Sequence, residues 1–135
     1  MKVPHKALVA LADGEHFVVL RNDGQILDPK LTKVAEPDVE ATNFSAGVRH
    51  QDHVGQRIGA TDLSELAHGA AVAEWLNAKA IAGDFDDLVI IADPKTLGEM
   101  RRHYHVELKN RLVAEIDKTL TGEPLERIEK ALADA

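Results

Sequence analysis

Hydrophobic residues fall into short strand-like runs in the first third of the chain. Residues 7–12 are almost wholly apolar, and the Asp-Gly pair at 13–14 supplies a tight-turn signal. A second β-rich run covers residues 17–20, and the Asn-Asp-Gly sequence at 22–24 ends it. A weaker third run covers residues 31–35. This spacing predicts a three-stranded antiparallel meander.

The middle of the chain alternates between helical and strand patterns. A helix is predicted from a cap at Thr61 or Asp62 to Gly83, since apolar residues recur along one helical face. Residues 88–92 carry no polar alternation, so we expect a central parallel strand that is buried on both faces. Pro94 begins a further helix, whose apolar stripe consists of Leu97, Met100, Tyr104 and Leu108.

Residues 112–120 fit two structures. Leu112, Ala114 and Ile116 alternate as they would in a half-buried strand, but Leu112, Ile116 and Leu120 also fit a helix that continues from the preceding one. Gly122 interrupts either pattern. Pro124 then opens a last helix, which faces inward through Leu125, Ile128 and Leu132.

The order of elements is β-β-β-α-β-α-(β)-α, which predicts a single α/β domain over residues 1–135. A meander followed by βα units gives a mixed sheet with helices on its faces. The two fully apolar runs, near residues 8 and 90, should lie side by side at the centre of the sheet. This is the chain order of the ribonuclease-H-like architecture, and fold alone does not set function.

Composition narrows the class of protein. The chain has 135 residues, a net charge of −7 and no cysteine, which excludes disulfides and thiolate metal sites. We find no secretory signal and no apolar stretch of the length that crosses a membrane. These features fit a cytoplasmic protein, and the acidic balance argues against nonspecific coating of nucleic acid.

Several segments resemble a family called "protein required for attachment to host cells". They are residues 8–14 (LVALADG), 74–77 (EWLN) before 83–86 (GDFD), 92–101 (ADPKTLGEMR) and 115–121 (EIDKTLT). The resemblance covers nearly the whole chain, and it rests on the order and spacing of the segments together. This family is grouped with bacterial relatives of the middle domain of archaeal and eukaryotic peptide-release factors. The resemblance implies the ribonuclease-H-like fold, with five strands in the sheet and residues 112–120 as the last of them.

The long loop over residues 38–60 is the place where the release factors carry a Gly-Gly-Gln motif. We expect this segment to be flexible, because it lacks clear periodicity. Only Gly55-Gln56 matches the motif here, and Val54 stands where the first glycine would be. Valine does not easily take the backbone geometry that glycine allows. Gln56 is therefore a weak catalytic candidate at a peptidyl-tRNA ester, and release activity is not implied.

Two carboxylates form a second candidate site. Asp13 ends the first strand and Asp93 ends the fourth, so both should lie at one edge of the sheet, where Glu65 could join them. Such carboxylates hold divalent metal ions in ribonuclease-H-like nucleases. The structural alternative is a turn residue at Asp13 and a helix cap at Asp93. His50, His53, His103 and His105 suggest no closed zinc site, because no third ligand is evident.

Basic residues suggest a nucleic-acid contact. Lys95, Arg102 and Lys109 recur every seven residues, which places them on one side of a single helix, with Arg101 beside them. Arg49 and Arg57 add positive charge in the loop. A local positive patch can bind phosphate on an acidic protein, whereas the alternative is an ordinary solvated face diluted by nearby glutamates.

The leading hypothesis is therefore a non-enzymatic, cytoplasmic binding module that contacts rRNA, tRNA, the ribosome or a translation factor. The alternatives are a hydrolase, through Gln56 or through Asp13 and Asp93, and a factor that promotes attachment to host cells. No cofactor and no membrane contact are expected. Two copies could associate along the short and partly polar third strand, at an exposed sheet edge.

Overall fold

The sheet has five strands in the order β3-β2-β1-β4-β5. The computed structural model describes residues 1–39 and 60–135. The strands are β1 (Leu8–Ala12), β2 (Phe17–Asn22), β3 (Leu31–Ala35), β4 (Leu88–Ala92) and β5 (Leu112–Asp117). The first three form the predicted antiparallel meander, and β4 runs parallel to both β1 and β5. The predicted contact between the two apolar runs is confirmed, because Ala10 pairs with Ile90 at the centre of the sheet.

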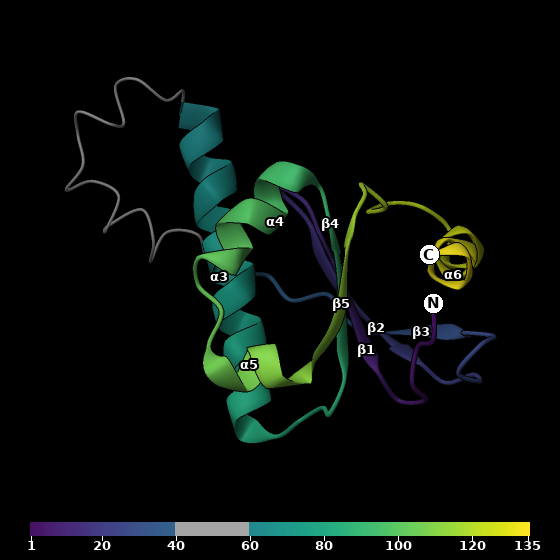
Figure 1. The fold of residues 1–135 in the computed structure, drawn as a ribbon. Helices are drawn as coiled ribbons and strands as arrows, with labels where there is room; N and C mark the ends of the chain where they lie inside the picture. Colours follow the sequence, from purple (N-terminus) through teal and green to yellow (C-terminus); the bar gives the residue numbers. More distant parts are fainter. Residues whose placement is uncertain (40–59) are drawn as a thin grey trace.

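The helices cover the two faces of the sheet unequally (Figure 1). One face carries α3 (Ala60–Ala82), α4 (Pro94–Arg101) and α5 (Val106–Arg111), and the other carries α6 (Leu125–Asp134). Each face has its own apolar cluster. Leu76, Ile90 and Met100 belong to the first cluster, whereas Ile91 and Ile128 belong to the second, and all five side chains are at most 2% exposed. The fold is a single α/β domain with a mixed five-stranded sheet.

The end of α3 follows from its sequence. Gly83 comes directly after the helix and has a φ of +75°, in the left-handed region that glycine tolerates without steric cost. The N–H of Gly83 donates to Ala80 O, and the N–H of Asp84 donates to Lys79 O. This paired arrangement satisfies the last carbonyls of the helix. The predicted helix end at Gly83 is confirmed.

The prediction of one continuous helix after Pro94 is wrong. The helix α4 ends at Arg101, and α5 begins at Val106. His105 caps α5, because its Nδ1 atom accepts the N–H of Glu107 at 3.0 Å. The buried Asn77 side chain of α3 also binds the backbone between α4 and α5. It donates to His103 O at 2.7 Å and accepts from the N–H of His105 at 2.9 Å. A capping residue and a buried amide thus stop a helix that periodicity alone would continue.

The expected apolar stripe nevertheless reaches the core. Leu97, Met100 and Leu108 are buried in the cluster beneath α3, and Tyr104 packs against it from the connection. The chain then enters β5, so the strand alternative for residues 112–120 is correct for Leu112–Asp117. Within the described ranges, none of the helices has the length and apolar character needed to cross a membrane.

Candidate functional site

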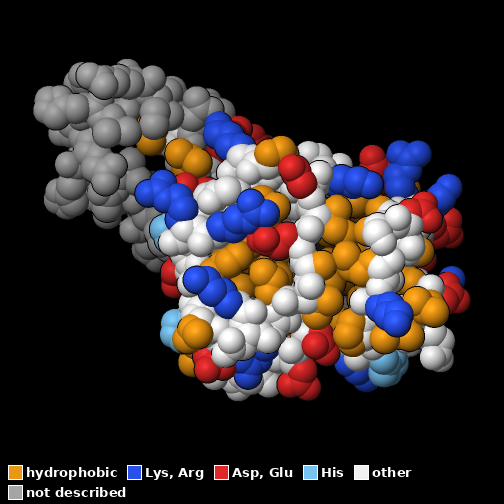
Figure 2. All heavy atoms as spheres, viewed as in Figure 1, with side chains coloured by type: hydrophobic (Ala, Val, Ile, Leu, Met, Phe, Trp, Pro, Cys, Tyr) orange, Lys and Arg blue, Asp and Glu red, His pale blue; other side chains and the backbone are white. Residues whose placement is uncertain are grey.

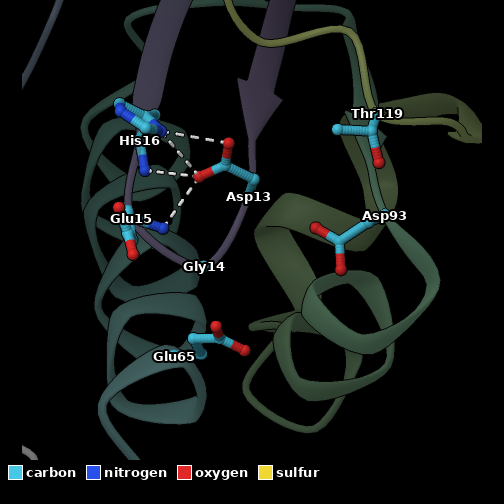
Figure 3. A pocket seen from close by; sticks show the side chains of 7 residues that line it. All are labelled: Asp13, Gly14, Glu15, His16, Glu65, Asp93 and Thr119. Atoms are coloured by element: carbon cyan, nitrogen blue, oxygen red, sulfur yellow. Dashed lines mark hydrogen bonds and ion pairs between the residues drawn. The ribbon is translucent and has the colours of Figure 1, made fainter. Parts of the chain in front are cut away.

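An acidic pocket lies at the carboxyl ends of β1 and β4 (Figure 3). Its volume is about 370 Å³ and its lining consists of Asp13, Gly14, Glu15, His16, Glu65, Asp93 and Thr119. Ligands of open α/β sheets bind in this position, outside the carboxyl ends of parallel strands. The structure therefore brings together the two carboxylates singled out in the sequence, together with Glu65 of α3.

Asp13 is the organising residue of this pocket. Its Oδ1 atom accepts the N–H groups of Glu15 and His16 at 2.8 and 2.6 Å, and its Oδ2 atom accepts the Thr121 hydroxyl at 2.5 Å. Burial raises the pKa of Asp13, but these hydrogen bonds to the charged form outweigh burial and lower its pKa to about 2. The hydrogen bond and the charge of Asp13 in turn raise the pKa of the exposed His16. The carboxylate is thus committed to holding the turn between β1 and β2.

Glu65 closes the pocket from the side of α3. A Cβ atom at Gly14 would lie 2.6 Å from Glu65 Cγ, so only glycine lets the two elements approach this closely. The carboxylate of Glu65 pairs with Lys95 at 3.0 Å. Lys95 therefore lies at the rim of the acidic pocket, at the opposite end of α4 from Arg101. Sequence reasoning could not find the Gly14–Glu65 contact, because it joins residues on two elements that are distant in the chain.

Asp93 caps α4, so the prediction of a helix-cap role for this residue is confirmed. Its Oδ2 atom accepts the N–H of Thr96 at 3.2 Å. Its Oδ1 atom is buried and has no hydrogen-bond partner among the described residues. Residues 1–39 and 60–135 contain no group of three or more histidine, aspartate or glutamate side chains placed to hold a metal ion. The role of Asp13 and Asp93 as metal ligands therefore stays a prediction.

The basic residues occupy a different surface, over α4 and α5. We call Arg101, Arg102 and Lys109 the basic face. The side chains of Arg101 and Arg102 are 55% and 75% exposed, and Lys109 is exposed as well. Figure 2 shows Lys and Arg side chains over these helices, interspersed with acidic ones. The break between α4 and α5 means that Lys109 does not continue the helical repeat of Lys95 and Arg102.

Each arginine of the basic face contacts a glutamate that is more buried than itself. Arg101 Nε lies 3.1 Å from Glu115 Oε1, and Arg102 Nη1 lies 3.4 Å from Glu99 Oε2. Glu115 is further held by the Tyr104 hydroxyl at 2.7 Å. Burial and this hydrogen bond to Glu115 raise the pKa of Tyr104, so the hydroxyl stays protonated and donates. The glutamates fix the guanidinium groups at the surface.

Five candidates from the loop lie outside the described residues. They are Arg49, His50, His53, Gln56 and Arg57. The catalytic role of Gln56 and the contribution of Arg49 and Arg57 to a basic surface therefore stay predictions. The sequence did not indicate that Asn77 and Glu115 anchor the basic face. Asn77 holds the connection between α4 and α5, and Glu115 contacts Arg101.

A family model for a bacterial archaeo-eukaryotic release factor family, family 12, matches residues 6–132. The match extends over almost the entire chain and agrees with the resemblance to release factors. It gives no support to the host-attachment name. No curated protein matches the chain.

Proposed function

The chain belongs to bacterial archaeo-eukaryotic release factor family 12, and from this premise we propose that it is a translation-related binding module that contacts RNA through its basic face. The RNA is rRNA of the ribosome or tRNA bound to it, and the module itself performs no catalysis. Membership of a release-factor family supports the link to translation. The position of Arg101 and Arg102 supports the choice of surface.

The exposure of the two arginines carries the proposal. Ion pairs at an exposed surface stabilise a fold by only about 0 to 1 kcal/mol, so Arg101 and Arg102 lose little when they exchange a glutamate for a phosphate. Guanidinium groups match phosphate oxygens with two parallel hydrogen bonds. A chain with a net charge of −7 would meet RNA through such a local surface, not through its overall field.

The fold family and the cellular location of the chain are proposed as well. The strand order β3-β2-β1-β4-β5 and the chain order β-β-β-α-β-α-β-α support a ribonuclease-H-like fold. The proposed contact with the translation machinery implies a cytoplasmic location. Attachment to host cells rests on sequence resemblance, and an effect of this kind would be indirect.

A hydrolase is the second candidate, because Asp13 and Asp93 line one pocket. Magnesium-dependent cleavage of RNA by the wild type, lost in Asp93→Asn, would favour this reading. Cleavage that persists in Asp93→Asn would point to a contaminating nuclease. Gln56, the other hydrolase candidate, lies outside the described residues.

Ribosome co-sedimentation from a cell lysate tests the proposed function. We expect comigration with ribosomes at low salt and its loss at high salt, because phosphate contacts release counterions. Absence from ribosomal fractions at both salt concentrations would refute a ribosomal contact. Comigration that is insensitive to salt would contradict binding through the basic face and indicate an apolar contact with a ribosomal protein.

A further inference from the structure

The face of the sheet that α6 covers is less completely filled than the other face. In the part of the chain that the structure describes, α6 is the single helix on this face, whereas α3, α4 and α5 share the opposite face (Figure 1). A pocket of about 290 Å³ remains between the meander and the start of α6, and we call it the apolar pocket. Its volume is close to the lower limit of about 300 Å³ for small-molecule sites, so it accommodates one ligand of amino-acid size.

The floor of this pocket is made of aliphatic side chains from the apolar cluster beneath α6. Leu11 of β1 pairs with Val18 of β2, and Leu20 follows Val18 by two positions, so the three side chains share one face of the sheet. Ile128 of α6 completes this lining. We call these four residues the apolar floor. An aliphatic or aromatic group placed on the apolar floor is removed from water, which favours its binding.

The apolar pocket is also lined by charged side chains of both signs. Two of them are cationic and two are anionic, and we call them the charged rim: His16, Lys33, Glu36 and Glu123. Their side chains are 35 to 66% exposed, so they lie where the pocket meets solvent. The hydrogen bond and the charge of Asp13 raise the pKa of His16, which favours its cationic form.

The charged rim is held by contacts that a ligand can replace. Lys33 pairs with Glu36 at 2.5 Å, and Glu123 lies 3.5 Å from Arg127. Ion pairs between exposed side chains contribute little to stability. A ligand that brings its own carboxylate and ammonium groups can therefore exchange these contacts for its own at small cost.

The apolar floor and the charged rim together select for one kind of molecule. An uncharged hydrocarbon would leave the charged rim unused, and a carboxylate with an aliphatic tail would face the two rim glutamates with a like charge. We propose that the apolar pocket binds a free apolar α-amino acid of the size of leucine or phenylalanine. Its side chain lies on the apolar floor, its carboxylate contacts the cations of the charged rim, and its ammonium group contacts the glutamates.

This site is separate from the basic face. The apolar pocket lies on the side of the sheet that carries α6, whereas the basic face lies over α4 and α5 on the other side. The proposal is therefore independent of RNA binding, and its test uses neither RNA nor the residues of the basic face.

Isothermal titration calorimetry of the full chain with L-leucine and L-phenylalanine tests the proposal. We expect at least one of them to bind saturably, with a dissociation constant of about 1 mM or lower. Three analogues of leucine each lack one feature: 4-methylpentanoate has no ammonium group, 3-methylbutylamine has no carboxylate, and L-alanine has no large apolar side chain. Each should bind at least about tenfold more weakly. No saturable binding of either amino acid would overturn the proposal, and so would an analogue that binds as tightly as leucine.

Two variants with matched controls locate the site. Val18→Trp fills the pocket and should abolish binding, whereas Val34→Trp, at a 41% exposed position of β3 outside the lining, should not. Lys33→Glu should weaken binding at least about tenfold. Lys30→Glu is its control, because Lys30 is an exposed lysine that pairs with Asp28 at 3.8 Å and does not line the pocket. Equal effects of a variant and its control would contradict the assignment of the site.

Amide chemical shifts of the wild type keep the proposal testable if a variant does not fold. On titration with L-leucine or L-phenylalanine, the amide signals of Val18, Leu20 and Gly122, which line the pocket, should move saturably. The amide signal of Gly98, in α4 on the other side of the sheet, should stay in place. Shifts that are absent at the lining residues, or as large at Gly98, would overturn the proposal.

Discussion

The acidic pocket and the basic face carry opposite charges and are held by different kinds of contact. Asp13 is 20% exposed, and two main-chain N–H groups and a hydroxyl surround it. Arg102 is 75% exposed, and one glutamate side chain contacts it at 3.4 Å. The carboxylates are therefore part of the framework of the fold, whereas the arginines are presented to solvent by that framework. A charge that the fold already uses is a poor candidate for binding a ligand, and an exposed, oriented charge is a good one.

The largest expected effect is a loss of stability on substitution of Asn77, which anchors the basic face. Asn77→Leu removes the partner of His103 O and of the N–H of His105 and leaves both groups in a partly buried position. We expect a loss of about 3 kcal/mol in the free energy of unfolding, since each unsatisfied group costs about 1 to 3 kcal/mol. Urea denaturation measures it. Glu74→Ala is the control, because Glu74 is exposed and accepts a long hydrogen bond of 3.4 Å from Asn77. A comparable loss of stability in this variant would contradict the anchoring role of Asn77.

Asp13→Asn tests the framework role of the acidic pocket. The pKa of Asp13 is lowered from 3.8 to about 2, so its charge contributes about 2 kcal/mol of stability above pH 4. A lowered folded-state pKa means that this contribution is lost as the pH falls through about 2. We expect the wild type to be more stable than the variant at pH 7, and the difference to shrink between about pH 4 and pH 2. A difference that stays constant down to pH 2 would exclude the charge as its source.

The smallest effect is a gain of binding. Glu115→Gln removes the charge that opposes Arg101 while an amide oxygen can still accept the Tyr104 hydroxyl. RNA affinity at low salt should rise by about threefold, because the local positive charge is no longer offset. Fluorescence anisotropy with a tRNA measures the change, and Glu126→Gln on α6 serves as the control for net charge. An equal gain in both variants would show that only net charge matters.

Most of the fold could be predicted from the sequence because its strands are strongly patterned. The uniformly apolar run at residues 88–92 identified the central strand, and Gly83 identified the end of α3. The break between α4 and α5 could not be predicted, since the helical pattern of Leu97, Met100, Tyr104 and Leu108 continues across it. The buried Asn77 lies in α3, 26 residues before His103 in the sequence. No local sequence pattern near His103 therefore indicates that the helix is interrupted there.

The candidate sites could be predicted only in part. Asp13 and Asp93 were placed correctly at one edge of the sheet, because each ends a strand and the two strands are parallel neighbours. The helix-cap role of Asp93 could be predicted from the local sequence, and the N–H of Thr96 confirms it. The Thr121 partner of Asp13 lies 108 residues away in the chain and becomes evident only in three dimensions. The prediction that Lys95, Arg102 and Lys109 share one side of a helix assumes that the helix is unbroken. It is wrong because α4 ends at Arg101 and α5 begins at Val106.

The most direct test of the central claim compares two double charge reversals in RNA binding over a range of salt concentrations. Arg101→Glu with Arg102→Glu alters the basic face. Arg127→Glu with Lys130→Glu makes the same change in net charge on the exposed side of α6. The account predicts that the first variant keeps its fold, binds a tRNA or rRNA fragment at least about tenfold more weakly at low salt, and loses about two units of the salt-dependence slope. The second should bind nearly as the wild type does. Equal losses in both variants, or no loss in the first, would contradict a specific RNA contact through Arg101 and Arg102.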